Sequence, residues 1–195
     1  MIPRALQITL LLLAVAVLGM GAYVVQLKRR AEQLDSHKAD QRPIAPPVAG
    51  KSEAVPLFVA YDDAAALRRE DTQVALPENS QERARAVLNA LLARYAAKDS
   101  PHPLGGGAEV ESVFLLNNRM AIVNLNSAFA AQHPSSVLSE SLTVSSLAQT
   151  LAASVPDVTQ VKFLVDGRER ETLAGHADLR GFYDIASVSS GAGSQ

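Results

Sequence analysis

The stretch VKFLVDGRERETLAGHADL, residues 161–179, gathers acids, arginines and a histidine behind an apolar strand. In a catalytic interpretation, His176 acts as a general base that Asp178 or Asp166 orients. Arg168 would then hold an anionic group of the substrate. Such a base must lie within hydrogen-bond reach of a nucleophile in a water-poor pocket. The chain contains many serines, but none lies in the Gly-x-Ser-x-Gly pattern of a nucleophile elbow.

The same stretch is also typical of a solvated turn after a strand, which is the simpler interpretation. Asp166–Gly167 is a turn signal, and the alternating charges of RERE, residues 168–171, suit an exposed sheet edge. His176 follows a bend at Gly175 and would bond to a nearby carbonyl or carboxylate. We therefore expect no catalytic residue here, and a binding role for this edge is the remaining alternative.

Neither the histidines nor the glycines give a metal or cofactor pattern. The four histidines, His37, His102, His133 and His176, fall at no metal-ligand spacing, and the chain has no cysteine. Glycines 105–107 follow a predicted helix and precede a predicted strand, the reverse of the order in a phosphate-binding loop. A net charge of −2 with 5% aromatic residues offers no surface for nucleic acid. We expect no metal, no cofactor and no nucleic-acid partner.

The N-terminal region predicts a membrane anchor. Residues 5–27 carry no charge and, as a helix, would span about 34 Å, enough for the hydrocarbon core of a bilayer. We expect an uncleaved single-pass transmembrane helix within residues 1–30, with a cleaved signal peptide as the alternative. Arg4 on one side and Lys28–Arg30 on the other leave the orientation close to a tie by the positive-inside rule.

The rest of the chain divides into a linker, one domain and a tail. Residues 31–54 are rich in proline and alanine and lack a hydrophobic period, as in an extended tether. The domain is predicted over residues 55–186, and residues 187–195 are predicted to be a disordered tail.

Hydrophobic periodicity predicts an α+β domain in the order β-β-α-β-β-α-β, a small mixed sheet with two α-helices on one face. Asn79 or Ser80 is expected to cap the first helix, and Ser136 the second, over residues 135–155. The final strand lies within 158–167.

A hairpin is predicted around Asn117–Asn118, as a two-residue turn. This turn would pair Val113 with Ile122, and Leu115 with Met120. Separately, Asp62 and Asp63 are expected to cap the turn after the first strand.

The second predicted helix carries a polar stripe. Its members are Ser139, Thr143, Ser146 and Thr150. We expect this stripe to be solvated or to dock a partner.

The strand AIVNLNSAF, the serine-rich helix with LAQTL, the strand VTQVKFLVDG and the segment GHADL together resemble the GerMN domain family of sporulation and germination proteins. The resemblance covers about residues 55–185. The matching residues are Val123, Leu125, Phe129, Thr150, Leu151, Val161, Gly167, Gly175 and His176. Asn124 stands where the family usually has an aspartate, so a carboxylate with a family-wide task is not expected there.

The resemblance implies a small protein–protein interaction module without catalytic residues, in a membrane-anchored or lipid-anchored protein that faces outward. Spore-forming members often have two copies, whereas this chain has one, so a general role in the cell envelope is the safer expectation. The family's placement also favours a domain outside the cytoplasmic membrane. A cytoplasmic domain is the alternative that the Lys28–Arg30 run allows.

We therefore expect a non-enzymatic module, tethered to the membrane through residues 5–27, that binds another envelope protein or itself. The candidate contact surfaces are the outer sheet face with Phe114, Arg119 and Val123, and the edge at 161–171 with Asp166 and Arg168, near His176. The rival hypothesis is an envelope protein that binds or hydrolyses cell-wall glycan with His176 and nearby acids.

Overall fold

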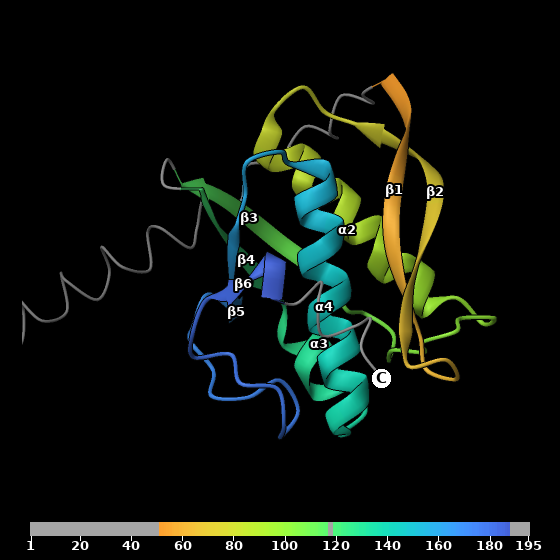
Figure 1. Cartoon of the computed structure of the whole chain (residues 1–195), viewed down its shortest axis with the longest axis vertical. Helices are drawn as coiled ribbons and strands as arrows, with labels where there is room; N and C mark the ends of the chain where they lie inside the picture. The colour runs from red at the N-terminus through yellow and green to blue at the C-terminus, as the bar shows by residue number, and fades with distance from the viewer. Residues whose placement is uncertain (1–50, 117–118, 188–195) are drawn as a thin grey trace, which may run out of the picture. The chain divides into compact units, whose positions relative to one another are not determined.

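The computed structural model describes residues 51–116 and 119–187, which form an α+β domain (Figure 1). In chain order the elements are β1 (Lys51–Tyr61), β2 (Ala66–Leu76), α2 (Ser80–Ala96), β3 (Val110–Leu116), β4 (Met120–Leu125), α3 (Ser127–Ala131), α4 (Val137–Ser154), β5 (Gln160–Val165) and β6 (Tyr183–Asp184). The predicted anchor, most of the predicted linker and residues 188–195 lie outside these ranges. Within the described residues, no helix is both long and apolar enough to cross a bilayer.

The strands form two separate sheets. β1 and β2 make an antiparallel ribbon, whereas β3, β4, β5 and β6 form a mixed sheet in that spatial order. β4 and β5 are parallel neighbours, and the chain between them runs through α3 and α4. Figure 1 shows α2 and α4 between the ribbon and the mixed sheet. The prediction of one sheet with two helices on one face was therefore wrong in layering, and it missed α3 and β6.

The helix ends follow local capping chemistry. The Asn79 side chain accepts the N–H groups of Gln81 and Glu82 at the start of α2, and Ser136 caps α4. These caps agree with the sequence-based expectation. β1 begins at Lys51, four residues before the predicted start of the domain.

The β3–β4 register differs by one residue from the prediction. Val113 pairs with Val123, and Leu116 pairs with Met120. Three residues therefore separate the paired ends, and Arg119, the last of them, has φ 65°. Three-residue hairpin loops commonly end on such a left-handed residue. Because side chains alternate along a strand, the new register turns Val123 into the core.

β1 pairs with β2 along one edge, and side chains of the helices satisfy its other edge. Phe58 N–H donates to Thr150 Oγ1 at 2.9 Å, and Ser146 Oγ donates to Phe58 C=O at 2.5 Å. Ala60 N–H donates to the Tyr95 hydroxyl at 2.9 Å, and this hydroxyl bonds to Ser146 Oγ. These contacts give buried backbone groups the partners that a third strand would supply.

The polar stripe of α4 is therefore part of the interior. Ser139, Thr143, Ser146 and Thr150 are all buried. The expectation of a solvated or partner-docking polar face was wrong because the hydroxyls serve groups within the same domain.

Candidate interaction site

The two predicted contact surfaces lie in different parts of the mixed sheet. In the β4–β5 ladder Met120 pairs with Gln160 and Leu125 with Val165, so Arg119 and Asp166 lie at opposite ends of the two strands. β5 itself lies between β4 and β6 and is not a free edge, although β6 pairs only with Gln160 and Val161. Among the described strands, β3 is the end strand on one side of the mixed sheet, and the short β6 is the end strand on the other.

The segment after β5 is the solvated turn that the simpler interpretation predicts. Val165 and Arg168 exchange backbone hydrogen bonds of 2.9 and 3.0 Å around Asp166 and Gly167, which both have positive φ. Residues 166–171 are exposed. A turn with two left-handed residues is the type that joins two-residue hairpins.

Asn124 stabilises this turn. Gly167 N–H donates to Asn124 Oδ1 at 2.7 Å, and the Asn124 amide donates to Glu111 Oε2 at 2.8 Å. An aspartate could accept the first bond but not donate the second, and it would repel Glu111. The Asn124 amide can therefore bond to both Gly167 and Glu111, which a carboxylate could not do.

The outer face of the mixed sheet exposes part of the predicted set. Phe114 is 50% exposed and Leu116 is 41% exposed, and Arg119 is also exposed. Val123, which was grouped with them, is fully buried because of the corrected register. Arg119 Nε donates to the Asp157 carbonyl at 3.0 Å, which ties the hairpin to the loop before β5.

His176 is oriented by Glu140, a residue that the sequence analysis missed. Glu140 is fully buried in α4, and its Oε1 lies 2.9 Å from His176 Nδ1. Its Oε2 accepts the backbone N–H groups of Ala174, His176 and Ala177 at 3.0, 3.0 and 2.8 Å. Burial disfavours the charged form, but these hydrogen bonds outweigh it and lower the pKa of Glu140 to about 2.

Glu140 thus clamps the segment 174–177 to α4. The expectation that His176 bonds locally to a carbonyl or carboxylate is right about the carboxylate but wrong about a local partner, because Glu140 lies on a helix 36 residues earlier. Asp178, the partner in the catalytic interpretation, bonds instead to Arg180 at 2.7 and 3.0 Å. One signal was available in the sequence, because Glu140 is the only charged residue between positions 135 and 155.

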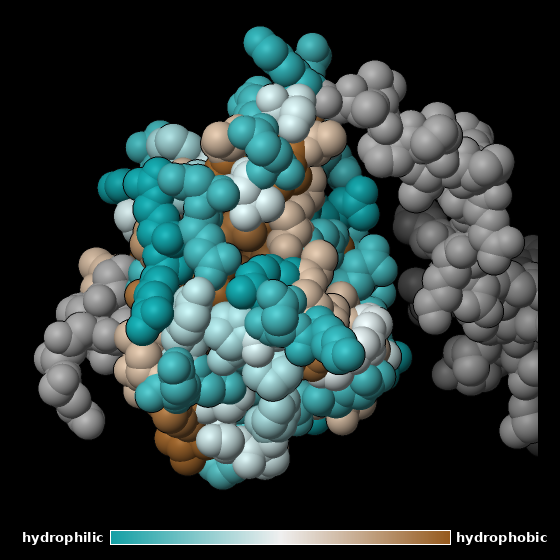
Figure 2. Space-filling model, turned by 90° about the vertical axis from the view of Figure 1, so that its right-hand side faces the viewer, coloured by the Kyte–Doolittle hydropathy of each residue, from teal (hydrophilic) through white to brown (hydrophobic). Residues whose placement is uncertain are grey.

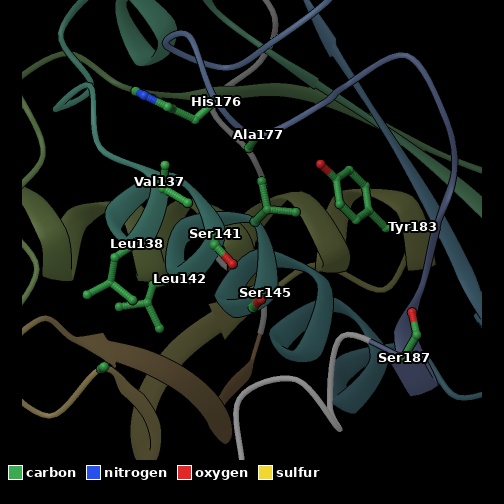
Figure 3. Close-up of a pocket in the computed structure, with 11 residues that line it drawn as sticks. Val137, Leu138, Ser141, Leu142, Ser145, His176, Ala177, Tyr183 and Ser187 are labelled. Carbon is green, nitrogen blue, oxygen red and sulfur yellow. The ribbon is translucent and has the colours of Figure 1, made fainter. Parts of the chain in front are cut away.

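A groove of about 460 Å³ lies beside α4, between the helix and the clamped segment (Figure 3). α4 contributes Val137 and Leu138, which are 67% and 46% exposed, with Ser141 and Ser145 further along. The remaining lining residues are Ala65, Leu142, Val144, His176, Ala177, Tyr183 and Ser187. Figure 3 shows His176 at one end of the groove and Tyr183 and Ser187 at the other.

The groove is predominantly apolar. The described residues that line it include no carboxylate, lysine or arginine. Hydrophilic residues, by contrast, cover most of the face that Figure 2 shows, on the side of β1 and β2. Acidic residues are favoured in the first turn of a helix, but the first turn of α4 exposes a valine and a leucine.

The structure does not bring the groups of the catalytic interpretation together around His176. Among the described residues no serine hydroxyl hydrogen-bonds to the His176 ring, and Asp166 and Arg168 do not line the groove. The same residues contain no group of three or more histidines, aspartates or glutamates placed to hold a metal ion. The groove has room for apolar side chains, and one of its walls is the segment 174–177, whose backbone is held by hydrogen bonds to Glu140.

The fold and this site define a small α+β domain with a mixed sheet, a separate ribbon and an apolar surface groove. Residues 56–171 match the family model Germane, described as "Sporulation and spore germination", and the chain belongs to that family. A search of characterised proteins found no match.

Two solved structures are similar to this chain, and the first of them shows the likeness of fold. The tandem GerMN domains of the sporulation protein GerM from Bacillus subtilis match with a TM-score of 0.55 and 15% identity, over 70% of this chain. This chain covers 48% of that tandem structure, about half its length. The first GerMN domain of the same protein matches with a TM-score of 0.44 and 15% identity, over 65% of this chain and 92% of that one.

Proposed function

We propose that the chain is a non-enzymatic interaction module of the cell envelope. Its N-terminal segment holds the domain at the outer face of the cytoplasmic membrane, and the groove beside α4 binds an apolar segment of another envelope protein. Membership of the sporulation and germination family supports an assembly role. The uncharged run of residues 5–27 supports the anchor, and the tether raises the effective concentration of the domain for a partner in the same membrane.

One observation carries the proposal: the groove combines exposed apolar side chains with a rigid wall. Val137 and Leu138 protrude from α4, and the opposite wall is fixed by the four hydrogen bonds of Glu140. A preformed apolar cleft loses little conformational entropy when it binds, so a short apolar segment can dock with useful affinity. The absence of formal charge among its described walls favours a partner side chain that is apolar as well.

The test is site-specific photocrosslinking in living cells. A crosslinking residue at position 138 in the full chain is expected to give one discrete adduct, identified by mass spectrometry as an envelope protein. The matched control places the same residue at position 116, an apolar site of similar exposure on β3, and gives no such adduct. If the adduct contains a second copy of this chain, the groove binds another copy of the protein and not a different envelope protein. Equal labelling at positions 138 and 116 would contradict a role of the groove in binding.

The orientation is tested separately. A periplasmic-type phosphatase fused after residue 195 is expected to be active, because the domain lies outside the cytoplasmic membrane in this proposal. An inactive fusion together with a fluorescent cytoplasmic reporter at the same position would place the domain inside and refute the envelope role.

A further inference from the structure

The outer strand of the β1–β2 ribbon has one edge that no described residue pairs with. Phe58 directs both its N–H and its C=O to side chains of α4, and therefore away from β2. In an antiparallel ladder, two opposite residues direct these groups either toward each other or away from each other. Because Phe58 is paired with Arg69, the backbone groups of Arg69 also point away from β1.

The same orientation repeats at every second residue of β2. Ala60 donates its N–H to the Tyr95 hydroxyl and is paired with Leu67. Pro56, which has no N–H to donate to β2, is paired with Asp71. The residues that direct their backbone groups to the outer edge of β2 are therefore Leu67, Arg69, Asp71, Gln73 and Ala75.

This outer edge is exposed along its length. Within residues 51–116 and 119–187, no hydrogen bond reaches the backbone of β2 apart from its ladder with β1. Figure 1 shows β2 on the outside of the ribbon, with β1 between it and α4. An unpaired strand edge is a surface to which another strand can add through main-chain hydrogen bonds.

The side chains along the edge carry opposite charges two residues apart. Arg69 and Asp71 both point to solvent, with side chains that are 62% and 59% exposed, and they bond to each other at 3.0 Å. Charges on an edge strand oppose pairing with any strand that leaves them uncompensated. A strand that fits this edge must therefore place an acid opposite Arg69 and a base opposite Asp71.

A second copy of β2 meets this requirement in one register. Two antiparallel copies related by a two-fold axis place one residue opposite itself, and the flanking residues pair symmetrically around it. If Glu70 is the central residue, each Arg69 faces Asp71 of the second copy. Moving the centre by one residue places either Arg69 opposite Arg69 or Asp71 opposite Asp71.

The central Glu70 is compensated within its own chain. Glu70 is paired with the buried Leu57, so its side chain lies on the inner face of the ribbon. Its carboxylate accepts the Tyr61 hydroxyl at 2.7 Å and Arg94 Nε at 3.3 Å. The two Glu70 carboxylates therefore face their own cations, and their mutual repulsion is reduced.

We propose that two copies of the chain associate edge to edge through β2, in the register centred on Glu70. The two ribbons then form one continuous antiparallel sheet, in the order β1–β2–β2–β1. Backbone hydrogen bonds join Leu67 to Gln73 and Arg69 to Asp71 of the other copy, and the symmetry forms each pair twice. None of these residues lines the groove beside α4, so this association is independent of the proposed function.

Disulfide crosslinking of the full chain in detergent micelles tests the register. The chain has no cysteine, and Leu67→Cys/Gln73→Cys introduces two thiols that face each other only between copies. Within one strand these positions lie about 20 Å apart, too far for a disulfide. The matched control Leu67→Cys/Ala75→Cys fits the register centred on Asp71. We expect oxidation to link two copies of the first variant, with at least about tenfold less dimer from the control. Equal yields, or no dimer from the first variant, would overturn the proposal.

A charge-reversal cycle tests the same register without cysteines. Arg69→Asp places two carboxylates opposite each other in both symmetric pairs, so we expect the dimer Kd from analytical ultracentrifugation to rise about tenfold. Arg69→Asp/Asp71→Arg exchanges the two charges and should restore the wild-type Kd. A wild type that stays monomeric, an unchanged Kd in the single variant, or no recovery in the double variant would each contradict the proposal.

Photocrosslinking in cells distinguishes a second copy from another partner. A crosslinking residue at position 73 in the full chain is expected to give an adduct of two copies. An adduct with a different protein would show that β2 pairs with a foreign strand, and would overturn self-association. Arg69→Asp should leave the adduct from position 138 in the groove unchanged, so a failure of this proposal can be told apart from a failure of the proposed function.

Discussion

The two sides of α4 depart in part from the usual division of polar and apolar residues, because polar side chains lie among the buried apolar ones and two apolar side chains are exposed. On the inward side the helix buries Glu140, Thr143 and Ser146, whereas Val137 and Leu138 are exposed beside the groove. The inward polar groups are needed because β1 and the segment 174–177 have backbone groups that no neighbouring strand satisfies. The exposed apolar groups have no such internal task. Stability and binding are therefore expected to be separable along one helix.

The largest effect is expected at Glu140. Glu140→Ala leaves three backbone N–H groups of the segment 174–177 without their acceptor, and we expect a loss of about 3–5 kcal/mol in the free energy of unfolding. Chemical denaturation of the full chain measures this loss. Glu140→Gln, which keeps one acceptor oxygen, should lose less. A loss below about 1 kcal/mol for the alanine variant would mean that the clamp is not a stabilising element.

Acid should remove nearly the same stabilisation without mutation. The folded-state pKa of Glu140 lies at about 2, below its ordinary value, so its contribution is present above about pH 4.5 and is lost as the pH falls toward 2. The shift corresponds to about 3 kcal/mol. In an acid titration of unfolding, Glu140→Gln should show a shallower dependence than the wild type, and identical curves would contradict this origin of the acid sensitivity.

Two adjacent serines on α4 compare its sides directly. Ser146→Ala removes the partner of the Phe58 carbonyl and of the Tyr95 hydroxyl, and we expect a loss of about 1–3 kcal/mol. Ser145→Ala, on the groove side, should change the unfolding free energy by less than about 0.5 kcal/mol. Equal losses for the two variants would show that the buried hydroxyl has no special role.

The sequence predicted those features that depend on neighbouring residues. The caps at Asn79 and Ser136, the turn at Asp166–Gly167 and the alternation of β5 each follow from residues a few positions apart. The β3–β4 register was missed because a three-residue loop that ends on Arg119, rather than on glycine or asparagine, has no strong sequence signal.

The misassigned polar stripe has a different cause. Hydrophobic periodicity treats serine and threonine as solvent-facing, but Ser146 and Thr150 bond to Phe58 on the open edge of β1, 88 and 92 residues earlier in the chain. The pairing of Glu140 with His176 and the meeting of His102 with His133 at Thr143 likewise depend on tertiary contacts. The apolar groove was not predicted at all, since exposed Val137 and Leu138 have the pattern of core residues.

The most direct measurement is Leu138→Asp, with unfolding and partner crosslinking recorded on the same variant. An acidic residue in the first turn of a helix is favourable by about 0.3–1 kcal/mol, so the free energy of unfolding should stay unchanged or rise slightly. The crosslinked adduct formed from the groove, with the probe at position 137, should be lost. Leu116→Asp, at a site of similar exposure on β3, should keep that adduct. A Leu138→Asp protein that folds normally and still forms the adduct would contradict the claim that this groove is the binding surface.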